Sequence, residues 1–358
     1  MAIRSDQDYL LQYKNSEQKY DHRLRTLINS GSLPEPISIK RQIMEVLLLF
    51  LLSLHTVRTA TEGKGKWCYT SQLCAVSNCS EPRQWKQLFA ECGKDSQSPI
   101  NIVTSKVKMD WNLKPFTFEG YEKQTAKWVL ENDGHSVKVT LQESAKITDG
   151  SLNSKYKATQ FHFHWGSHGN WGSSPGSEHS IDGERYAMEL HIVHRREDLS
   201  SDAEAVKHKD GLAVLGFFIK VGRKNTNYKP LIDQLQYIKA KGKKVQMEPL
   251  ALKSLIPHEK NLTRYYRYAG SLTTPGCNEA VVWTVFEEPI ELGQQQVQAF
   301  PTTVFFSTNL SLPMMDNFRP IQPLGNRTVY KSSAGAILPP AKALLVITIA
   351  YLMVTLFQ

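Results

Sequence analysis

Short runs of alternating hydrophobic and polar residues dominate the middle of the chain, between residues 67 and 330. Such runs cover Trp128–Asn132, Ser136–Leu141 and Val281–Phe286, and Gly, Pro, Asn and Asp separate them. Alternation with a period of two is typical of strands with one buried face, whereas long helical patterns are few here. No repeat and no linker interrupts this stretch. The pattern therefore predicts one β-rich domain.

The N-terminal part of the chain has a different pattern. Residues 1–43 are polar, and the apolar run Val46–Leu54 follows them. That run is shorter than the roughly 20 residues that span a bilayer, but it has the length of a signal-peptide core. We predict a signal peptide over residues 44–60, after an N-terminal extension that is absent from the working protein. Translation from Met44 is an alternative to such an extension.

The C-terminal residues 332–358 have the pattern of a lipid-anchor signal. The segment Ala343–Phe357 is apolar and uncharged, and the small residues Ser332 and Ser333 precede it across a short spacer. This arrangement predicts cleavage after Ser332 or Ser333 and attachment of a glycosylphosphatidylinositol (GPI) anchor. A short transmembrane helix is the alternative, although the apolar run falls short of a full span.

Cysteines and glycosylation sequons indicate the secretory route. Five cysteines fit a secreted chain with two disulfides and one thiol left over, and none forms a Cys-x-x-Cys pair that would suggest a cysteine zinc site. Sequons for N-glycosylation are present at Asn78, Asn261, Asn309 and Asn326. Together with the two end signals, they predict an extracellular, GPI-anchored protein at the plasma membrane.

The charge distribution argues against nucleic acid as a partner. The chain carries 43 Lys and Arg against 34 Asp and Glu, a formal net charge of +9, but the basic residues are scattered and no run of five occurs. A nucleic-acid site would gather them on one face or in one segment. We interpret the charge as an aid to solubility or as a mild attraction to an acidic membrane surface.

Two predicted strands carry histidines that can share a metal ion. Side chains alternate along a strand, so His162 and His164 lie on one face of the segment 160–165. The segment 188–193 supplies a third imidazole, His191, in the same way. Three neutral imidazoles and one open position are the usual protein ligands of a catalytic zinc ion.

Each of these segments also carries a partner for an imidazole. Gln160 and Glu189 lie two residues before His162 and His191 on the same strand faces. An amide or carboxylate oxygen there can accept the outer ring N–H and so fix the tautomer of the imidazole. The alternative is three surface or packing histidines, and the coincidence of spacing, face and partner argues against it.

Several separated motifs resemble the alpha-class carbonic anhydrases. The stretch Ser177–Val193 is similar to the signature of that family throughout. Other segments follow in the order of the family, namely Gln97–Ile102, Gly134–Ser136, Ser271–Cys277 and Asp316–Pro320. The resemblance covers residues 67–330, and Cys92, Cys277 and the anchored tail make it greatest to the membrane-anchored members.

The resemblance implies a fold and a reaction. The fold would be a single α+β domain over residues 61–331, with a large, twisted, mostly antiparallel central sheet, short peripheral helices and a conical cleft. The reaction would be the zinc-dependent, reversible hydration of carbon dioxide to bicarbonate and a proton, by attack of a zinc-bound hydroxide. Bicarbonate transporters and the membrane, through the GPI lipid, are the expected partners besides the substrates.

The resemblance also assigns roles to individual residues. The zinc ligands would be His162, His164 and His191. Their outer hydrogen-bond partners would be Gln160, Glu189 and the backbone carbonyl of Asn317. The hydroxyl of Thr273 would orient the hydroxide and donate a hydrogen bond to Glu178. The surface that receives carbon dioxide would consist of Val193, Val214, Leu272, Thr273, Thr274, Val281 and Trp283.

His135 matches the proton shuttle of the family. An imidazole with a pKa near 6.5 can take and give a proton at neutral pH, which regeneration of the hydroxide requires. The alternative is a turn histidine that is exposed by chance. Lys138 departs from the family pattern, and as a cation near the cleft it would depress the pKa of His135.

The remaining cysteines and histidines receive structural roles. By resemblance, the disulfides would be Cys68–Cys79 and Cys92–Cys277, which leaves Cys74 free. His179 would be buried in hydrogen bonds beside Glu178, and the other histidines are interpreted as structural or surface residues, namely His168, His194, His208 and His258. Two competing functions are a cupin-type metal enzyme, which would need a nearby downstream Glu, and an inert extracellular binding module of the same fold. Retention of all three zinc-ligand positions argues against the inert module.

Overall fold

The computed structural model describes residues 66–72, 79–124, 128–142, 145–169, 172–248 and 250–333. The chain divides into two compact units, Met1–Gly63 and Lys64–Gln358, and every described residue lies in the second. The expected signal peptide, the tail after Ser333, Cys74 and Asn78 therefore lie outside the described residues. Within the described part, no helix is long and apolar enough to cross a membrane.

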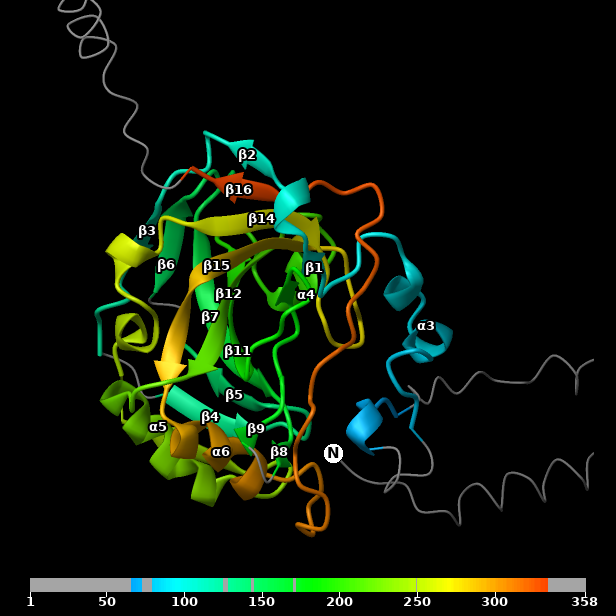
Figure 1. Ribbon diagram of the computed structural model, residues 1–358, viewed down its shortest axis with the longest axis vertical. Helices are drawn as coiled ribbons and strands as arrows, with labels where there is room; N and C mark the ends of the chain where they lie inside the picture. The colour runs from blue at the N-terminus through cyan, green and yellow to red at the C-terminus, as the bar shows by residue number, and fades with distance from the viewer. Residues whose placement is uncertain are drawn as a thin grey trace, which may run out of the picture. The chain divides into compact units, whose positions relative to one another are not determined.

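One large twisted sheet of 12 strands forms the frame of the second unit (Figure 1). Its strands follow the order β13, β4, β5, β7, β11, β12, β15, β14, β16 and β2, while β6 pairs with both β7 and β3 off this path. Most neighbours are antiparallel, whereas the pairs β12–β15 and β16–β2 are parallel. The predicted β-rich fold with a large, mostly antiparallel sheet is confirmed. The strand bounds are β2 Lys108–Asp110, β3 Phe116–Glu119, β4 Trp128–Asn132, β5 Val137–Thr140, β6 Lys146–Asp149, β7 Tyr156–Trp165, β11 Met188–Arg196, β12 Leu212–Val221, β13 Lys244–Met247, β14 Tyr265–Gly270, β15 Val281–Leu292 and β16 Tyr330–Ser332.

Helices in the described part are short and lie around the sheet (Figure 1). The longest, α6, begins after Gly293, whose backbone N–H donates to the side chain of Gln296 at 3.0 Å. The helix bounds are α3 Trp85–Leu88, α4 Asp202–Ala205, α5 Lys229–Gln234 and α6 Gln294–Thr303. The 3-10 turns are η1 Thr70–Gln72, η2 Ala90–Gly93, η3 Thr104–Lys106, η4 Thr226–Tyr228, η5 Leu235–Tyr237, η6 Leu252–Leu255 and η7 Glu259–Asn261. Two small ladders pair β1 Asn101–Ile102 with β10 Ser180–Ile181, and β8 His168–Gly169 with β9 Gly172–Ser173.

Hydrophobic cores cover both faces of the sheet and determine where polar side chains can lie. On β7, Phe161, Phe163 and Trp165 are buried in the larger core, so the alternate residues face the other side. A second core contains Val193, Val214 and Trp283. The histidines of β7 share their side of the sheet with this second core, because side chains alternate along a strand.

Two disulfides tie outlying segments to the sheet. Cys68 is bonded to Cys79, and Cys92 is bonded to Cys277 across 185 residues of sequence. These are the pairs that the family resemblance implies. The first holds the segment around Trp67 in place, and the second holds the loop before β15 against η2.

Candidate metal centre and its surroundings

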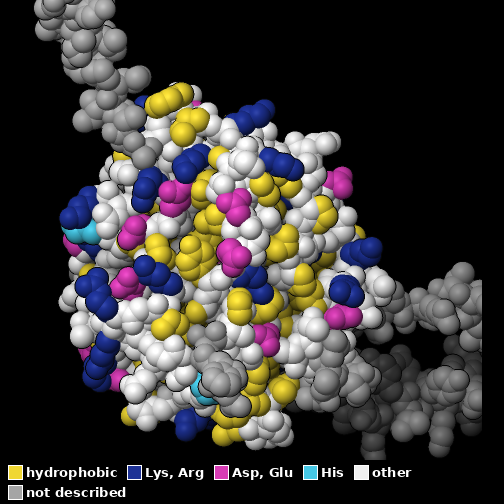
Figure 2. Space-filling model, in the orientation of Figure 1, with side chains coloured by type: hydrophobic (Ala, Val, Ile, Leu, Met, Phe, Trp, Pro, Cys, Tyr) yellow, Lys and Arg dark blue, Asp and Glu magenta, His cyan; other side chains and the backbone are white. Residues whose placement is uncertain are grey.

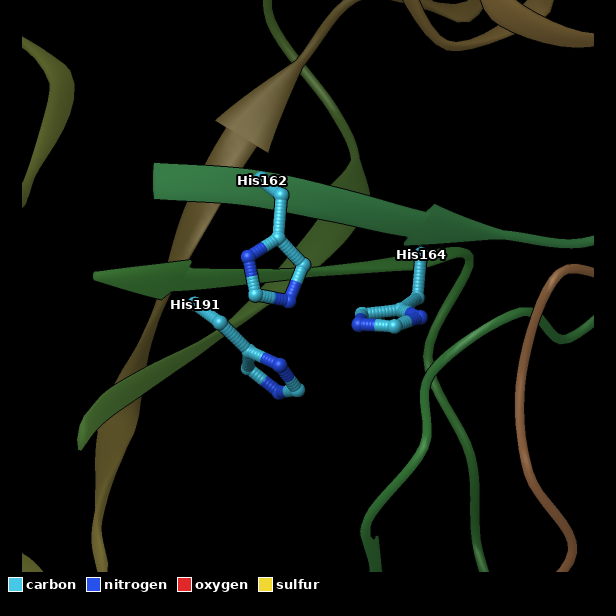
Figure 3. A group of neighbouring side chains, drawn as sticks. All are labelled: His162, His164 and His191. Atoms are coloured by element: carbon cyan, nitrogen blue, oxygen red, sulfur yellow. The ribbon is translucent and has the colours of Figure 1, made fainter. Parts of the chain in front are cut away.

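Three imidazoles from two neighbouring strands converge on one point (Figure 3). The antiparallel register of β7 and β11 places His162 directly opposite His191, and His164 opposite Glu189. The three ring centroids lie 4.6 to 5.2 Å from one another. One ring nitrogen of each histidine lies within 4.8 Å of the other two, so the three can bind a single ion.

An oxygen atom accepts the outer N–H of each imidazole. Nδ1 of His162 lies 2.8 Å from Oε1 of Gln160, and Nε2 of His191 lies 2.6 Å from Oε1 of Glu189. Nδ1 of His164 lies 2.8 Å from the backbone carbonyl of Asn317. These oxygens only accept hydrogen bonds, so the ring nitrogens donate and each inner nitrogen keeps its lone pair.

The inner nitrogens fit a zinc ion. Nε2 of His164 is buried and has no hydrogen-bond partner, which is rare for a buried polar atom and needs an explanation. Burial lowers the pKa of His164 and, together with the charges of His164 and His191, holds the pKa of His162 well below its ordinary value. The rings of His162 and His164 are therefore neutral, which is the form that binds metal. A set of three imidazoles around one point matches a catalytic zinc site.

Glu189 holds two histidines at once. Oε1 accepts from Nδ1 of His179 at 2.7 Å as well as from His191, and Oε2 accepts the backbone N–H of His179 at 2.8 Å. Burial opposes ionisation of this carboxyl, but the adjacent imidazoles outweigh it and hold the pKa of Glu189 well below its usual range. His179, Glu189 and His191 also lie close enough to hold an ion. Because Glu189 hydrogen-bonds to both histidines, we interpret these three residues instead as a hydrogen-bonded chain that orients His191.

His179 is buried in hydrogen bonds, as predicted, although its partners are more remote in sequence than Glu178. Its Nε2 lies 2.6 Å from the hydroxyl of Tyr268, which in turn lies 2.9 Å from the hydroxyl of Ser98. Sequence reasoning missed Tyr268, because nothing in its strand pattern distinguishes it from an ordinary core tyrosine.

The hydrogen bond expected between Thr273 and Glu178 is not formed in this structure. Both side chains are buried, but Oε1 of Glu178 accepts the backbone N–H of Arg319 at 2.8 Å and Oε2 has no hydrogen-bond partner. Oε2 lies 3.4 Å from Nε2 of His164 and 3.9 Å from Nδ1 of His191. The carboxylate therefore lies near the inner ring nitrogens without a hydrogen bond to them or to the hydroxyl.

Apolar side chains lie beside the imidazoles. Val193 on β11 is opposite Val214 on β12, which is opposite Trp283 on β15, and all three are buried in one cluster together with Val281. The ring of Trp283 lies 4.8 Å from that of His191. Leu272 packs partly buried against the same cluster. Thr274 is half-buried in the loop between β14 and β15.

His135 lies in the turn between β4 and β5, where it stacks on Trp67. The two ring centroids are 3.7 Å apart and the ring planes differ by 13°. The backbone carbonyl of His135 accepts a hydrogen bond from the Asn317 side chain at 3.0 Å. Nδ1 of the ring is buried and has no hydrogen-bond partner. The ring is therefore partly covered, unlike a turn histidine exposed by chance.

The environment of His135 departs from the prediction in two ways. Burial lowers the pKa of His135 to about 4, although Asp133 opposes the shift, so the stacked ring does not titrate near 6.5. The cation that lowers this pKa is Lys241 rather than Lys138. Lys138 lies opposite Glu131 in the strand register and binds its carboxylate at 2.6 Å.

Lys241 comes close to His135 because residue 134 is a glycine. Gly134 has a φ of 91°, and a Cβ there would lie 2.5 Å from the Lys241 side chain. Trp67 and Lys241 are remote in sequence from His135, and no pattern in the chain links them to it.

The other predicted positions are distributed as follows. Ser332 is buried at the end of β16, and Ser333 follows it half-buried. His194 is buried against Tyr121, and burial lowers its pKa to about 4. His168 and His258 are exposed and His208 is partly exposed. The sequons within the described residues are all at exposed positions, namely Asn261, Asn309 and Asn326.

Comparisons with known proteins agree with this geometry. Residues 80–333 match the family model of eukaryotic-type carbonic anhydrase. The chain is 44% identical over 310 residues to carbonic anhydrase 4 of Rattus norvegicus, which covers 86% of this chain and 97% of that protein. It is 43% identical over 315 residues to carbonic anhydrase 4 of Oryctolagus cuniculus, with 87% and 99% covered. Carbonic anhydrase 12 of Homo sapiens is 37% identical over 293 residues, with 80% and 78% covered.

Proposed function

Because the chain belongs to the eukaryotic-type carbonic anhydrase family, and is thus a carbonate dehydratase, we propose that it works with a zinc ion held by His162, His164 and His191. The reaction is the reversible hydration of carbon dioxide to bicarbonate and a proton. The observation that carries the zinc assignment is the convergence of three inner ring nitrogens whose outer nitrogens are already hydrogen-bonded.

Zinc bound by three imidazoles lowers the pKa of a water molecule to about 7, a value established for the carbonic anhydrase family itself, and so supplies a hydroxide nucleophile at neutral pH. The protein contributes the orientation of the three rings. Gln160, Glu189 and the carbonyl of Asn317 hold each ring in one tautomer, which directs the lone pairs inward.

Thr273 and Glu178 are assigned to the orientation of the attacking oxygen. The buried hydroxyl of Thr273 would accept a hydrogen bond from it, which directs its lone pair toward the carbon of the substrate. To do so, Thr273 must donate its own hydrogen to a fixed acceptor. Oε2 of Glu178 is available for that purpose, because it has no hydrogen-bond partner.

The apolar side chains beside the imidazoles suit an uncharged substrate. Carbon dioxide has no charge to pair, so it requires a dry surface next to the nucleophile rather than a salt bridge. Val193, Val214 and Trp283 lie on adjacent strands, and Trp283 contacts the ring of His191. We assign the substrate to this surface, with Val281, Leu272 and Thr274 around it.

We assign His135 to proton export, on the condition that its ring can leave Trp67. A ring with a pKa of about 4 is a poor proton acceptor at neutral pH, so His135 would act only after leaving Trp67. In water its pKa would return toward 6.5. The shuttle is then a ring that alternates between a stacked and a solvated position.

We assign the enzyme to the outer face of the plasma membrane, held by a GPI anchor. Ser332 is bound within the sheet, since its hydroxyl accepts from the backbone of Tyr265 at 2.9 Å and donates to Thr263 at 2.8 Å. Cleavage after Ser333 would leave this strand intact, so Ser333 is the better of the two attachment sites. Bicarbonate is charged and cannot cross the bilayer unaided, which makes bicarbonate transporters functional partners at that surface.

The test combines metal analysis with two assays. Purified protein should contain about one zinc ion per chain and should hydrate carbon dioxide, and removal of the zinc with a chelator should abolish the activity reversibly. Full activity in metal-free protein would contradict the zinc assignment. For the anchor, phosphatidylinositol-specific phospholipase C should release active enzyme from cells. Activity that stays on the membrane with an intact Phe357 peptide would show a transmembrane helix instead.

A further inference from the structure

The outer edge of the sheet carries large hydrophobic side chains in contact with solvent. Met109 in β2 is 49% exposed, Trp111 directly after β2 is 52% exposed, and Tyr330 in β16 is 39% exposed. Strand β2 is the last strand in the sheet order, and β16 is its neighbour. Exposed tryptophan is uncommon on a soluble domain, so a gathering of this kind points to a binding surface. We call these three residues the β2 edge.

A groove of about 390 Å³ beside the β2 edge combines apolar and basic side chains. Its apolar lining includes Val107, Ile321 and Leu324. Lys106 and Lys108 also line it, and no carboxylate does. Neither lysine forms an ion pair with any residue that the structure describes. In Figure 2, hydrophobic and basic side chains lie next to each other over the end of the molecule where Figure 1 places β2 and β16.

The chain leaves the described domain at this same edge. The parallel register pairs Ser332 with Asp110, the residue that precedes Trp111. Neighbouring strands lie about 4.8 Å apart, so Ser333 begins the tail within a few ångströms of Trp111. The uncharged apolar segment Ala343–Phe357 lies further along the tail. Whatever attaches this end of the chain to a membrane therefore starts beside the β2 edge.

We propose that the β2 edge, with Lys106 and Lys108, rests on the lipid bilayer and orients the enzyme there. This proposal rests on the membrane anchor proposed above. Tryptophan and tyrosine are enriched at the level of the lipid headgroups, where an apolar ring meets a wet surface. Lysines without carboxylate partners complement lipid phosphates. Two copies of the same basic groove would repel each other, which disfavours a second copy of this chain as the occupant.

This orientation keeps the imidazole cluster away from the lipid. From β11, which carries His191, the sheet order passes through β12, β15, β14 and β16 before it reaches β2. Five strand spacings of about 4.8 Å correspond to about 24 Å. Contact at the β2 edge therefore leaves the site open to the aqueous side, where carbon dioxide, bicarbonate and buffer exchange.

The test uses the full protein reconstituted into vesicles that contain brominated phosphatidylcholine, which quenches tryptophan at the interface. The chain has seven tryptophans, and none lies in residues 1–66 or 334–358, so neither a lipid anchor nor a helical one adds a signal. We expect brominated lipid to quench the wild type more than Trp111→Phe, by up to about one seventh of the emission. The matched control is Trp111→Phe with Tyr237→Trp, because Tyr237 is 60% exposed in η5 and follows α5, which lies at the opposite end of Figure 1 from β2. The indole introduced at position 237 should escape the quencher.

The possible outcomes distinguish a failure of the proposed orientation from a failure of the proposed anchor. Equal quenching of the wild type and Trp111→Phe, or quenching of the double variant equal to that of the wild type, would overturn the orientation and leave the anchor intact. Failure of the protein to enter vesicles at all would overturn the anchor and the orientation together. Replacing Lys106 and Lys108 by Gln should weaken quenching in vesicles with anionic lipid. Unchanged quenching would show that these lysines do not contribute to the membrane-binding surface. Carbon dioxide hydration by every variant should match the wild type.

Discussion

The imidazole cluster and the His135 turn use the same side chain in opposite ways. In the cluster, two adjacent central strands hold the rings in register, and an oxygen atom binds every outer nitrogen. In the turn, the ring of His135 has an unpartnered Nδ1 and is held by stacking on Trp67. A stacked aromatic pair contributes about 0.5–1.5 kcal/mol beyond burial, which thermal motion can overcome. Under the proposed roles, the metal ligands, which must stay in place, lie on strands, and the proton shuttle, which must move, lies on a turn.

The largest expected effect is at the cluster itself. Changing His191 to Ala leaves two imidazoles, too few for the tetrahedral site, so both zinc and activity should be lost. Metal analysis and carbon dioxide hydration of the purified variant check this. His208→Ala, which removes a partly exposed histidine that pairs with Glu204, is the matched control and should retain both. A His191→Ala protein with bound zinc and normal turnover would contradict the assignment.

The next effect concerns the support of the cluster. Glu189→Gln keeps the shape of the side chain but removes the charge that two histidines share, so zinc affinity should fall about 10–100-fold. Competition with a chelator of known affinity measures it. Glu119→Gln, at a partly exposed ion pair with Lys155, should leave the affinity unchanged. An unaltered zinc affinity in Glu189→Gln would mean that the charge of Glu189 does not help to orient His191.

A smaller effect is expected at the turn. His135→Ala should slow turnover in weak buffer about tenfold, below the 10²–10⁴ typical of a group that acts in the chemical step, because buffer can replace it. The carbon dioxide addition step, measured by isotope exchange, should be nearly unchanged. Added imidazole should restore turnover. Equal turnover of variant and wild type in weak buffer would exclude His135 as the shuttle.

Trp67→Ala probes the stacked position directly. Removing the indole exposes His135 to water, so its pKa should rise from about 4 toward 6.5, and proton transfer at neutral pH should increase a few-fold. An NMR titration of the His135 ring protons measures the pKa. Trp67→Phe, which retains a stacking ring, should keep the pKa low. A pKa that stays near 4 in Trp67→Ala would assign the shift to Lys241 and the rest of the turn.

The last effect is on stability rather than on activity. His135 and His194 both have a pKa of about 4 in the folded chain and about 6.5 when unfolded, so the unfolded state binds more protons between these values. The free energy of unfolding should therefore fall as pH falls from about 6.5 to about 4, by at most about 1.4 kcal/mol per pH unit for each histidine. Denaturant unfolding at several pH values measures this slope. His135→Gln should reduce it, and an unchanged slope would contradict the shift.

Local pattern was sufficient to predict the strands that carry the cluster. Period-two alternation in β7 separates His162 and His164 from Phe161 and Phe163, and the same rule applies to β11. The parallel pairing of β12 with β15 could not be predicted from local pattern, because it depends on how distant segments meet rather than on either strand alone. The overall sheet and the disulfide pairs came from the family resemblance.

Contacts between remote segments explain what sequence reasoning missed at the site. The ring of Trp67 covers that of His135, and Lys241 lowers the pKa of His135, yet both residues lie far from it along the chain. Lys138 was expected to act on His135 because the family pattern places it near the cleft, but strand register directs it to Glu131. The carboxylate of Glu178 likewise lies near the buried ring nitrogens and accepts no hydrogen bond from Thr273. Electrostatics at a site depends on three-dimensional neighbours, which alternation does not encode.

The position of β16 determines when the sheet can be completed during synthesis. Among the described strands, β2 joins the main sheet only through β16, although the two come from nearly opposite ends of the described chain. A nascent chain therefore carries β2 unpaired until Tyr330–Ser332 leave the ribosome. Truncation of the chain before Tyr330 would remove β16 and leave β14 with an open edge. Such an edge can pair with other chains.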